Sequence, residues 1–194
     1  LVFPGVEDFG IVPVECQPSD ERNEILSIVA VGRLDPIKAF DILIEQVARL
    51  KMDFRLAIIG EGPHEPKLRS MIKALGLDHK VSLLGFRSDI PKLMSEADLT
   101  VISSRSEGFS LVAAESMFYA KVLLSTRVGG ALDLLDGSFL CEQVQLAEVI
   151  TRIAEDYPTY RRRFKALQES CRDSLTMATA AAAYLDFYRR SLSH

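Results

Sequence analysis

Short apolar segments alternate with glycine-rich turns and amphipathic segments along most of this chain, and no other feature limits its fold as strongly. Continuous apolar segments of strand length are typical of strands buried on both faces of a sheet. The expected strands cover 26–31, 54–59, 81–84, 99–102, 122–125 and 139–140. This alternation predicts an α/β fold with a parallel sheet of about six strands, helices on both faces and right-handed crossovers.

Apolar residues at helical spacing predict the connecting helices. The expected helices cover 39–51, 66–75, 89–96 and about 109–120, with further C-terminal helices from 143 onward. Gly76 directly follows the second of these segments and is a typical helix stop.

Strands of a parallel sheet end at one edge, and ligands of open α/β sheets bind there. Five expected strands are followed at that edge by turns rich in glycine, serine or charge. These turns are Gly32–Lys38, Gly60–Pro63, Gly85–Arg87, Ser103–Ser110 and Thr126–Gly130. We therefore expect the functional residues in these turns.

Glu107 and Glu115 are the most informative residues of the fourth turn and its helix. Glu107 is expected at the strand-to-helix junction, where backbone N–H groups and the helix dipole favour an anion and Gly108 lets a ligand approach. Glu115 is expected about two turns further along, on roughly the same helix face. An unpaired carboxylate is costly among apolar neighbours, so a functional role is favoured over two solvated acids. The pair indicates one ligand that carries both hydroxyls and phosphate.

Composition excludes several classes of function. The 194 residues are 48% apolar, enough to bury one sizeable core. A net charge of −4 argues against a nucleic-acid partner. The three cysteines and three histidines are scattered, so we expect reduced thiols, no metal site and no Cys/His catalytic pair. No apolar stretch is long enough for a transmembrane segment.

Five motifs occur together between residues 25 and 135. They are VGRLDPIKAFDILI at 31–44, IIGEGPHEPKL at 58–68, VSLLGF at 81–86, ADLTVISSRSEGFSLVAAESM at 97–117 and VGG at 128–130. In this order they resemble the C-terminal, donor-binding half of retaining glycosyltransferases of family 4 (glycosyl transferases group 1). The resemblance implies the GT-B architecture, in which two Rossmann-like domains face each other across a cleft.

The resemblance implies a role for each matching residue. Arg33 and Lys38 would hold the donor diphosphate, Glu115 the ribose hydroxyls and Glu107 the transferred sugar, so that Glu107, Arg33 and Lys38 would be the catalytic residues. Taken singly, the two cations would be read as surface charges. The remaining donor-binding residues would be Gly60, Gly62, Gly85, Phe86, Arg87, Gly108, Phe109, Ser110 and Leu111.

The implied activity is transfer of a hexosyl group, with retention, from a UDP- or GDP-linked sugar to a glycan, lipid or other acceptor. No cofactor or metal is expected, and the nucleotide sugar is a substrate. The expected setting is polysaccharide biosynthesis in the cytoplasm, with peripheral association at the inner face of a membrane left open. The acceptor would be held by an absent N-terminal domain, so the isolated chain is expected to be inactive.

The domain expectations follow from the same resemblance. Residues 1–24 would lead in from the missing N-terminal domain, and 25–175 would form the nucleotide-sugar-binding domain. A helix over 176–194 would pack towards the missing domain. Its aromatic residues could instead belong to the core.

Four departures from the family pattern stand out. Ala39 replaces a usual glycine, Ala120–Val122 replaces Gly-x-Pro, Asp133 replaces glutamate, and 136–142 is shorter than usual. They leave the identity of the donor open and allow an altered activity. Two rival functions remain: a nucleotide-sugar-binding module without turnover, and a sugar-nucleotide epimerase of the same architecture, which the E-x7-E and GRL-x3-K motifs fit less well. A phosphoacceptor receiver domain is disfavoured, because the expected acidic cluster after the first strand is missing.

Overall fold

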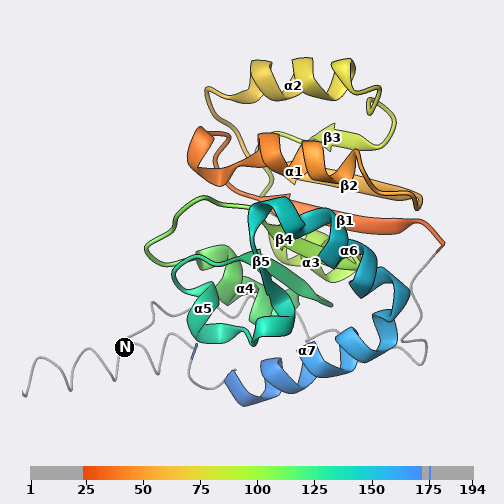
Figure 1. Ribbon diagram of the computed structural model, residues 1–194. Helices are drawn as coiled ribbons and strands as arrows, with labels where there is room; N and C mark the ends of the chain where they lie inside the picture. Colours follow the sequence, from red (N-terminus) through yellow and green to blue (C-terminus); the bar gives the residue numbers. More distant parts are fainter. Residues whose placement is uncertain (1–23, 172–174, 176–194) are drawn as a thin grey trace, which may run out of the picture.

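Six parallel strands form a single sheet in the computed structural model, which describes residues 24–171 and Leu175 (Figure 1). The strands are β1 (Leu26–Val31), β2 (Phe54–Ile59), β3 (Val81–Leu83), β4 (Leu99–Ile102), β5 (Leu123–Thr126) and β6 (Leu140–Cys141). Their order in the sheet is β3-β2-β1-β4-β5-β6. This is the doubly wound, Rossmann-like order, and it confirms the predicted fold class.

The helices are α1 (Phe40–Val47), α2 (Glu65–Ala74), α3 (Ile90–Glu96), α4 (Leu111–Tyr119), α5 (Ala131–Leu134), α6 (Leu146–Glu155) and α7 (Tyr157–Cys171). Three short 3-10 turns, η1 (Pro36–Lys38), η2 (Gly137–Phe139) and η3 (Gln143–Gln145), lie between them. Among these described helices, none has the length and apolar character that a membrane crossing needs.

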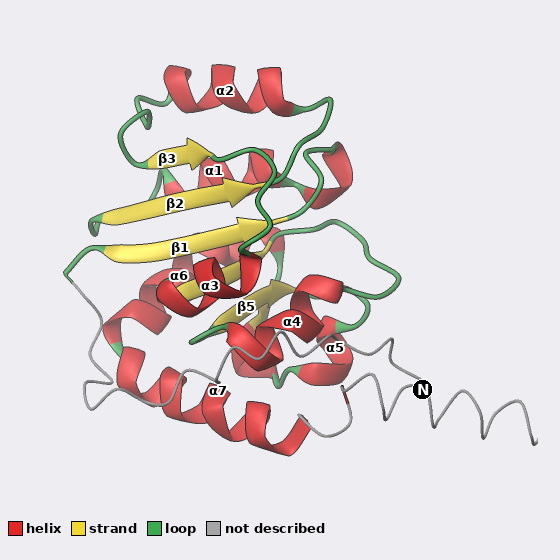
Figure 2. Cartoon of the chain, turned by 180° about the vertical axis from the view of Figure 1, so that it is seen from behind, coloured by secondary structure: helices red, strands yellow, loops and turns green. Residues whose placement is uncertain are grey.

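Helices cover both faces of the sheet. Figure 1 shows α1 and α6 in front of the strands, and Figure 2, seen from behind, shows α3 and α4 in front of them. Alternate residues of β1 supply the two cores: Leu26, Ile28 and Ala30 belong to the larger one, and Val29 to the smaller one with Met94 of α3. The continuous apolar strands are thus buried on both faces.

Sequence periodicity located the strands to within one residue. The predictions for β1, β2 and β4 are confirmed, β5 and β6 are shifted one residue later, and β3 ends one residue earlier. The first helix was predicted to reach about Lys51, and this was wrong because α1 ends at Val47. The following N–H groups of Arg49 and Leu50 bond three residues back, which tightens the chain into a turn. The proposed segments 1–23 and 176–194 lie outside the described residues.

The two halves of the sheet meet over a short contact. Only two residue pairs, Ile28↔Leu99 and Val29↔Thr100, are in register between β1 and β4 in the described sheet. Asp98 joins the amino-terminal ends of the same strands: its Oδ2 accepts hydrogen bonds from Ser27 N at 3.0 Å and from Ser27 Oγ at 2.7 Å. The order of the strands reverses between β1 and β4, and in doubly wound sheets ligands bind beyond the carboxyl ends of the strands at such a switch point.

Candidate functional site

The turns that were predicted to carry the site do lie at one edge of the sheet, to the right in Figure 2. Backbone hydrogen bonds join the first three of them. Gly32 N donates to Ile59 O at 2.9 Å, Leu34 N donates to Glu61 O at 2.9 Å, and Gly60 N donates to Gly85 O at 2.9 Å. The edge is therefore a connected set of loops.

Gly60 and Gly62 are required by the contact between the first two turns. A Cβ on Gly60 would lie 1.9 Å from Gly32 O, and one on Gly62 would lie 2.3 Å from Leu34 O. Both atoms belong to the backbone, so they cannot move aside as a side chain could. The glycines thus have a packing role that is independent of the predicted donor contact.

The turn that carries Lys38 is tightly held and strained. Asp35 Oδ1 accepts a hydrogen bond from Ile37 N at 3.0 Å and one from Lys38 N at 3.4 Å. The next residue, Ala39, is buried and has a φ of 51°, in the left-handed region. That conformation costs an L-residue about 1–2 kcal/mol. The alanine that departs from the family pattern therefore stores strain next to the predicted phosphate-binding lysine.

Lys38 and Glu107 meet at the switch point of the sheet, where Lys38 lies in the loop after β1 and Glu107 in the loop after β4. Lys38 Nζ lies 3.0 Å from Glu107 Oε1, and the side chains are 23% and 7% exposed. Ser104 Oγ donates to the same carboxylate oxygen at 2.6 Å. The structure thus brings together a cation and a carboxylate that are far apart in the sequence.

Arg33 does not share this contact. Its side chain is 73% exposed, and its Nε lies 3.9 Å from Asp35 Oδ2. It stands on the Lys38 turn with its guanidinium group open to solvent, so the guanidinium can contact an incoming anion.

The start of α4 differs from the prediction. Ser110 is the N-cap, and its Oγ accepts a hydrogen bond from Ala113 N at 3.3 Å. Glu107 therefore lies in the turn before the helix, and Glu115 is the fifth residue of α4. The expectation that both carboxylates share a helix face two turns apart was wrong, because the cap delays the helix until Leu111.

Glu115 is half-buried. Burial raises the pKa of its carboxyl group above the ordinary value of 4.5. Within residues 24–171, no hydrogen bond or ion pair offsets that cost for the Glu115 carboxylate. A buried carboxylate with open acceptor sites is suited to a ligand that brings hydroxyl donors.

The backbone of Gly129 and Gly130 packs against the backbone of the loop that carries Glu107. The sequence motif alone did not predict this packing role. A Cβ on Gly129 would lie 2.5 Å from Glu107 O and 2.6 Å from Gly108 O. Gly130 has a φ of 78°, and its Cβ would lie 2.7 Å from Ser110 N. The turn after β5 therefore packs directly on the backbone of the turn after β4.

The residues predicted to border a base lie beyond β3. Phe86 is 74% exposed, which leaves its ring available for stacking. Arg87 is held by Asp89, with 2.6 Å between Nη2 and Oδ2. Gly85 has a φ of 68°, which explains the glycine at this turn.

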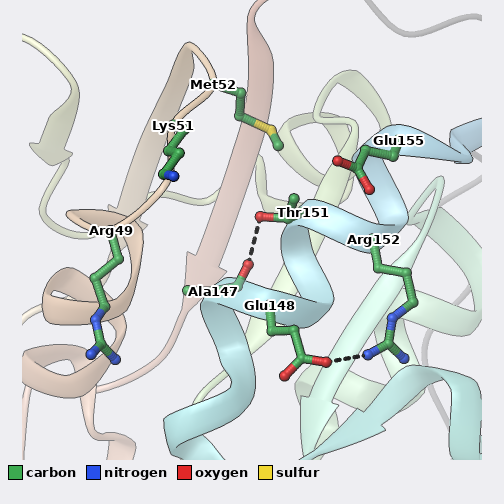
Figure 3. Close-up of a pocket in the computed structure, with 8 residues that line it drawn as sticks. All are labelled: Arg49, Lys51, Met52, Ala147, Glu148, Thr151, Arg152 and Glu155. Atoms are coloured by element: carbon green, nitrogen blue, oxygen red, sulfur yellow. Dashed lines mark hydrogen bonds and ion pairs between the residues drawn. The ribbon is translucent and has the colours of Figure 1, made fainter.

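A separate groove lies between the α1–β2 connection and α6, away from these loops (Figure 3). Arg49 and Lys51 come from one wall, and Glu148 and Arg152, which form a 2.6 Å ion pair, from the other. None of the predicted donor-binding residues lines it. Among the described residues, no group of three His, Cys, Asp or Glu side chains could hold a metal ion.

Residues 26–156 match the family Glycosyl transferases group 1. The chain belongs to this family. The match covers all six strands and the five loops at the carboxyl edge.

Curated relatives agree with this membership. A Campylobacter jejuni 4-alpha-N-acetylgalactosaminyltransferase that acts on a diphospho-undecaprenol-linked saccharide is 44% identical over 90 residues, 46% of this chain and 25% of its own length. The N-acetyl-alpha-D-glucosaminyl L-malate synthase of Bacillus anthracis is 25% identical over 87% of this chain and 46% of its own length. The chain thus spans less than half of either relative.

Solved structures show the same architecture. The Anabaena protein HepE, in complex with UDP and glucose, matches with a TM-score of 0.81 and 26% identity, over 86% of this chain and 49% of HepE. WaaG, a glycosyltransferase involved in lipopolysaccharide biosynthesis, matches in fold with a TM-score of 0.77 and 20% identity, over 94% of this chain and 54% of WaaG. The fold of this family member is that of one half of a GT-B glycosyltransferase.

Gly129→Ala tests the packing of the two loops. We expect the substitution to lower the free energy of unfolding in urea by about 1–3 kcal/mol, because the added methyl group meets two backbone carbonyl oxygens. Gly137→Ala is the matched control, since a Cβ there meets nothing within 4 Å, and it should leave the stability unchanged or raise it slightly. Equal effects of the two substitutions would contradict the packing described for Gly129.

Proposed function

We propose that this domain is the donor-binding half of a retaining family 4 glycosyltransferase and that it binds a UDP- or GDP-linked sugar. The observation that carries the proposal is the meeting of Lys38 and Glu107 at the switch point between β1 and β4, in a member of Glycosyl transferases group 1. Ligands of doubly wound sheets bind at this switch point.

The site divides into three parts that suit the parts of a nucleotide sugar. Lys38 and the exposed Arg33 are placed for the diphosphate, which favours charge-assisted hydrogen bonds. Glu115, whose carboxylate has no partner among the described residues, is suited to the two ribose hydroxyls. Glu107, at the start of the turn before α4, would contact the transferred sugar.

During transfer, the bond between the anomeric carbon and the diphosphate breaks and negative charge grows on the leaving group. Lys38, Arg33 and the N-terminus of α4 would stabilise that charge, which is the preorganised electrostatic effect that often contributes most to catalysis. Departure and attack on the same face of the sugar would retain the anomeric configuration. This step needs no metal ion in the proposal.

An acceptor-binding domain is the other part of the proposal. The chain spans 49% of HepE, and the facing half would hold the acceptor against the anomeric carbon. The complex of HepE with UDP and glucose supports a UDP-linked hexose as the donor. We place the whole enzyme in the cytoplasm, with access to the inner face of a membrane through the acceptor domain.

Calorimetric titration with UDP, GDP and UDP-glucose tests the donor site. We expect a uridine or guanosine diphosphate to bind, and Arg33→Ala and Lys38→Ala each to weaken binding by about 1.5–3 kcal/mol, since each removes a charge-assisted contact. Lys73→Ala is the control, because Lys73 is an exposed cation on α2. The site assignment fails if no nucleotide binds at millimolar concentration, or if all three variants bind alike.

The raised pKa of Glu115 predicts how donor binding depends on pH. Protonation of the carboxyl removes the charge that accepts the ribose hydroxyls, so affinity for UDP-glucose should fall as the pH is lowered through this pKa. The pKa of Glu115 is higher in the folded chain than in the unfolded chain, so this group also makes the free energy of unfolding depend on pH. Its contribution to stability is complete below the unfolded pKa and is lost as the pH rises through the folded pKa.

The measurement is titration with UDP-glucose from neutral pH down past the ordinary carboxyl value of 4.5, because the diester phosphates of its diphosphate stay ionised throughout. Glu115→Gln should bind more weakly at high pH and lack this part of the pH dependence, whereas Glu107→Gln should retain it. A Glu115→Gln variant with the wild-type pH profile would refute the ribose assignment.

A further inference from the structure

Two consecutive buried serines, Ser103 and Ser104, directly follow β4 at the carboxyl edge of the sheet. Ser103 is 1% exposed and Ser104 is 2% exposed. Neither belongs to the residues assigned above to the donor. The hydroxyl group of each serine donates a hydrogen bond to one member of the Lys38–Glu107 ion pair. The packing of β4 in the sheet does not require these two hydrogen bonds.

Ser103 holds the backbone of the lysine. Its Oγ donates to Lys38 O at 2.8 Å, across the boundary between the two halves of the sheet. The carbonyl oxygen of Ser103 in turn accepts a hydrogen bond from Gln143 Nε2 at 2.9 Å. Because Asp35 already bonds Lys38 N, both backbone polar groups of Lys38 are fixed. The side chain of Lys38, with its ammonium group, therefore starts from a backbone whose position is fixed by hydrogen bonds.

Ser104 holds the side chain of the glutamate. Its Oγ donates to Glu107 Oε1 at 2.6 Å, and its carbonyl oxygen accepts from Thr126 Oγ1 at 2.7 Å. Lys38 Nζ shares the same carboxylate oxygen. If a diphosphate draws Lys38 towards itself, Ser104 is the partner that keeps Glu107 in place. A hydrogen bond to a charged group has enough strength for that task.

We propose that Ser103 and Ser104 are positioning residues with separate effects: Ser103 sets Lys38 for the diphosphate, and Ser104 sets Glu107 for the transferred sugar. The assignment rests on the proposed function, because the two roles differ only if the site binds a nucleotide sugar. It goes beyond that function by predicting which half of the donor each serine affects.

The test compares the affinities of UDP and UDP-glucose for the wild-type chain, Ser103→Ala and Ser104→Ala. Ser103→Ala should weaken both ligands alike, by about fivefold, since both carry the diphosphate. Ser104→Ala should leave UDP within twofold of wild type and weaken UDP-glucose by about tenfold. Ser106→Ala removes an exposed hydroxyl from the same loop and should change neither affinity.

A double-mutant cycle separates positioning from a general loosening of the loop. Ser104→Ala should cause no further loss of UDP-glucose affinity in a Glu107→Ala background, because alanine has no side-chain oxygen to which Ser104 could donate. Additive losses would overturn the role of Ser104. If Ser104→Ala gives no folded protein, Ser104→Cys, which keeps a group at the γ position but is a weaker donor, provides the same comparison.

The remaining outcomes are also distinct. Equal losses of UDP and UDP-glucose in both serine variants, or wild-type affinities in both, would overturn the positioning roles while leaving the donor site intact. A wild-type chain that binds neither ligand would overturn the proposed function, and the serine assignment with it. Thermal unfolding of each variant shows whether a loss of affinity accompanies a loss of stability.

Discussion

The contact between the loops after β1 and β4 is the constraint on which the rest of this structure depends. In the described sheet the two halves join where β1 pairs with β4, over two residue pairs in register. Asp98 joins the amino-terminal ends. At the carboxyl ends, Arg105 N donates to Ile37 O at 2.7 Å, and Lys38 pairs with Glu107. The contacts that join the two halves of the sheet at its carboxyl edge therefore also bring the site residues together.

This coupling explains how charges can be kept in a largely buried place. A buried ion pair loses solvation, and it is tolerated when additional hydrogen bonds satisfy both partners. Ser104 and Lys38 share Glu107 Oε1, while Lys38 keeps part of its side chain exposed. An incoming diphosphate would replace Glu107 as the anionic partner of Lys38. The lysine is thus already partly desolvated before the donor arrives, which lowers the cost of binding.

Local pattern predicted much of this molecule, because strands buried on both faces and glycine turns leave clear signals. β1, β2 and β4 were located residue by residue, and Glu107 and Glu115 were singled out from their turn and helix. Lys38 was selected only through the resemblance to the family. The start of α4 was predicted about two residues too early, since it depends on the cap at Ser110. The roles of Ser103, Ser104 and Gly129 arise from contacts between segments far apart in the sequence, and no local spacing encodes them.

The central claim is that the switch point between β1 and β4 receives the donor, and a crystal structure of the chain with UDP-glucose tests it most directly. The diphosphate should lie within hydrogen-bond distance of Lys38, with the ribose hydroxyls donating to Glu115 and the sugar beside Glu107. Nucleotide bound in the groove between α1 and α6, or at the loop edge without contact to Lys38 or Glu115, would contradict the account.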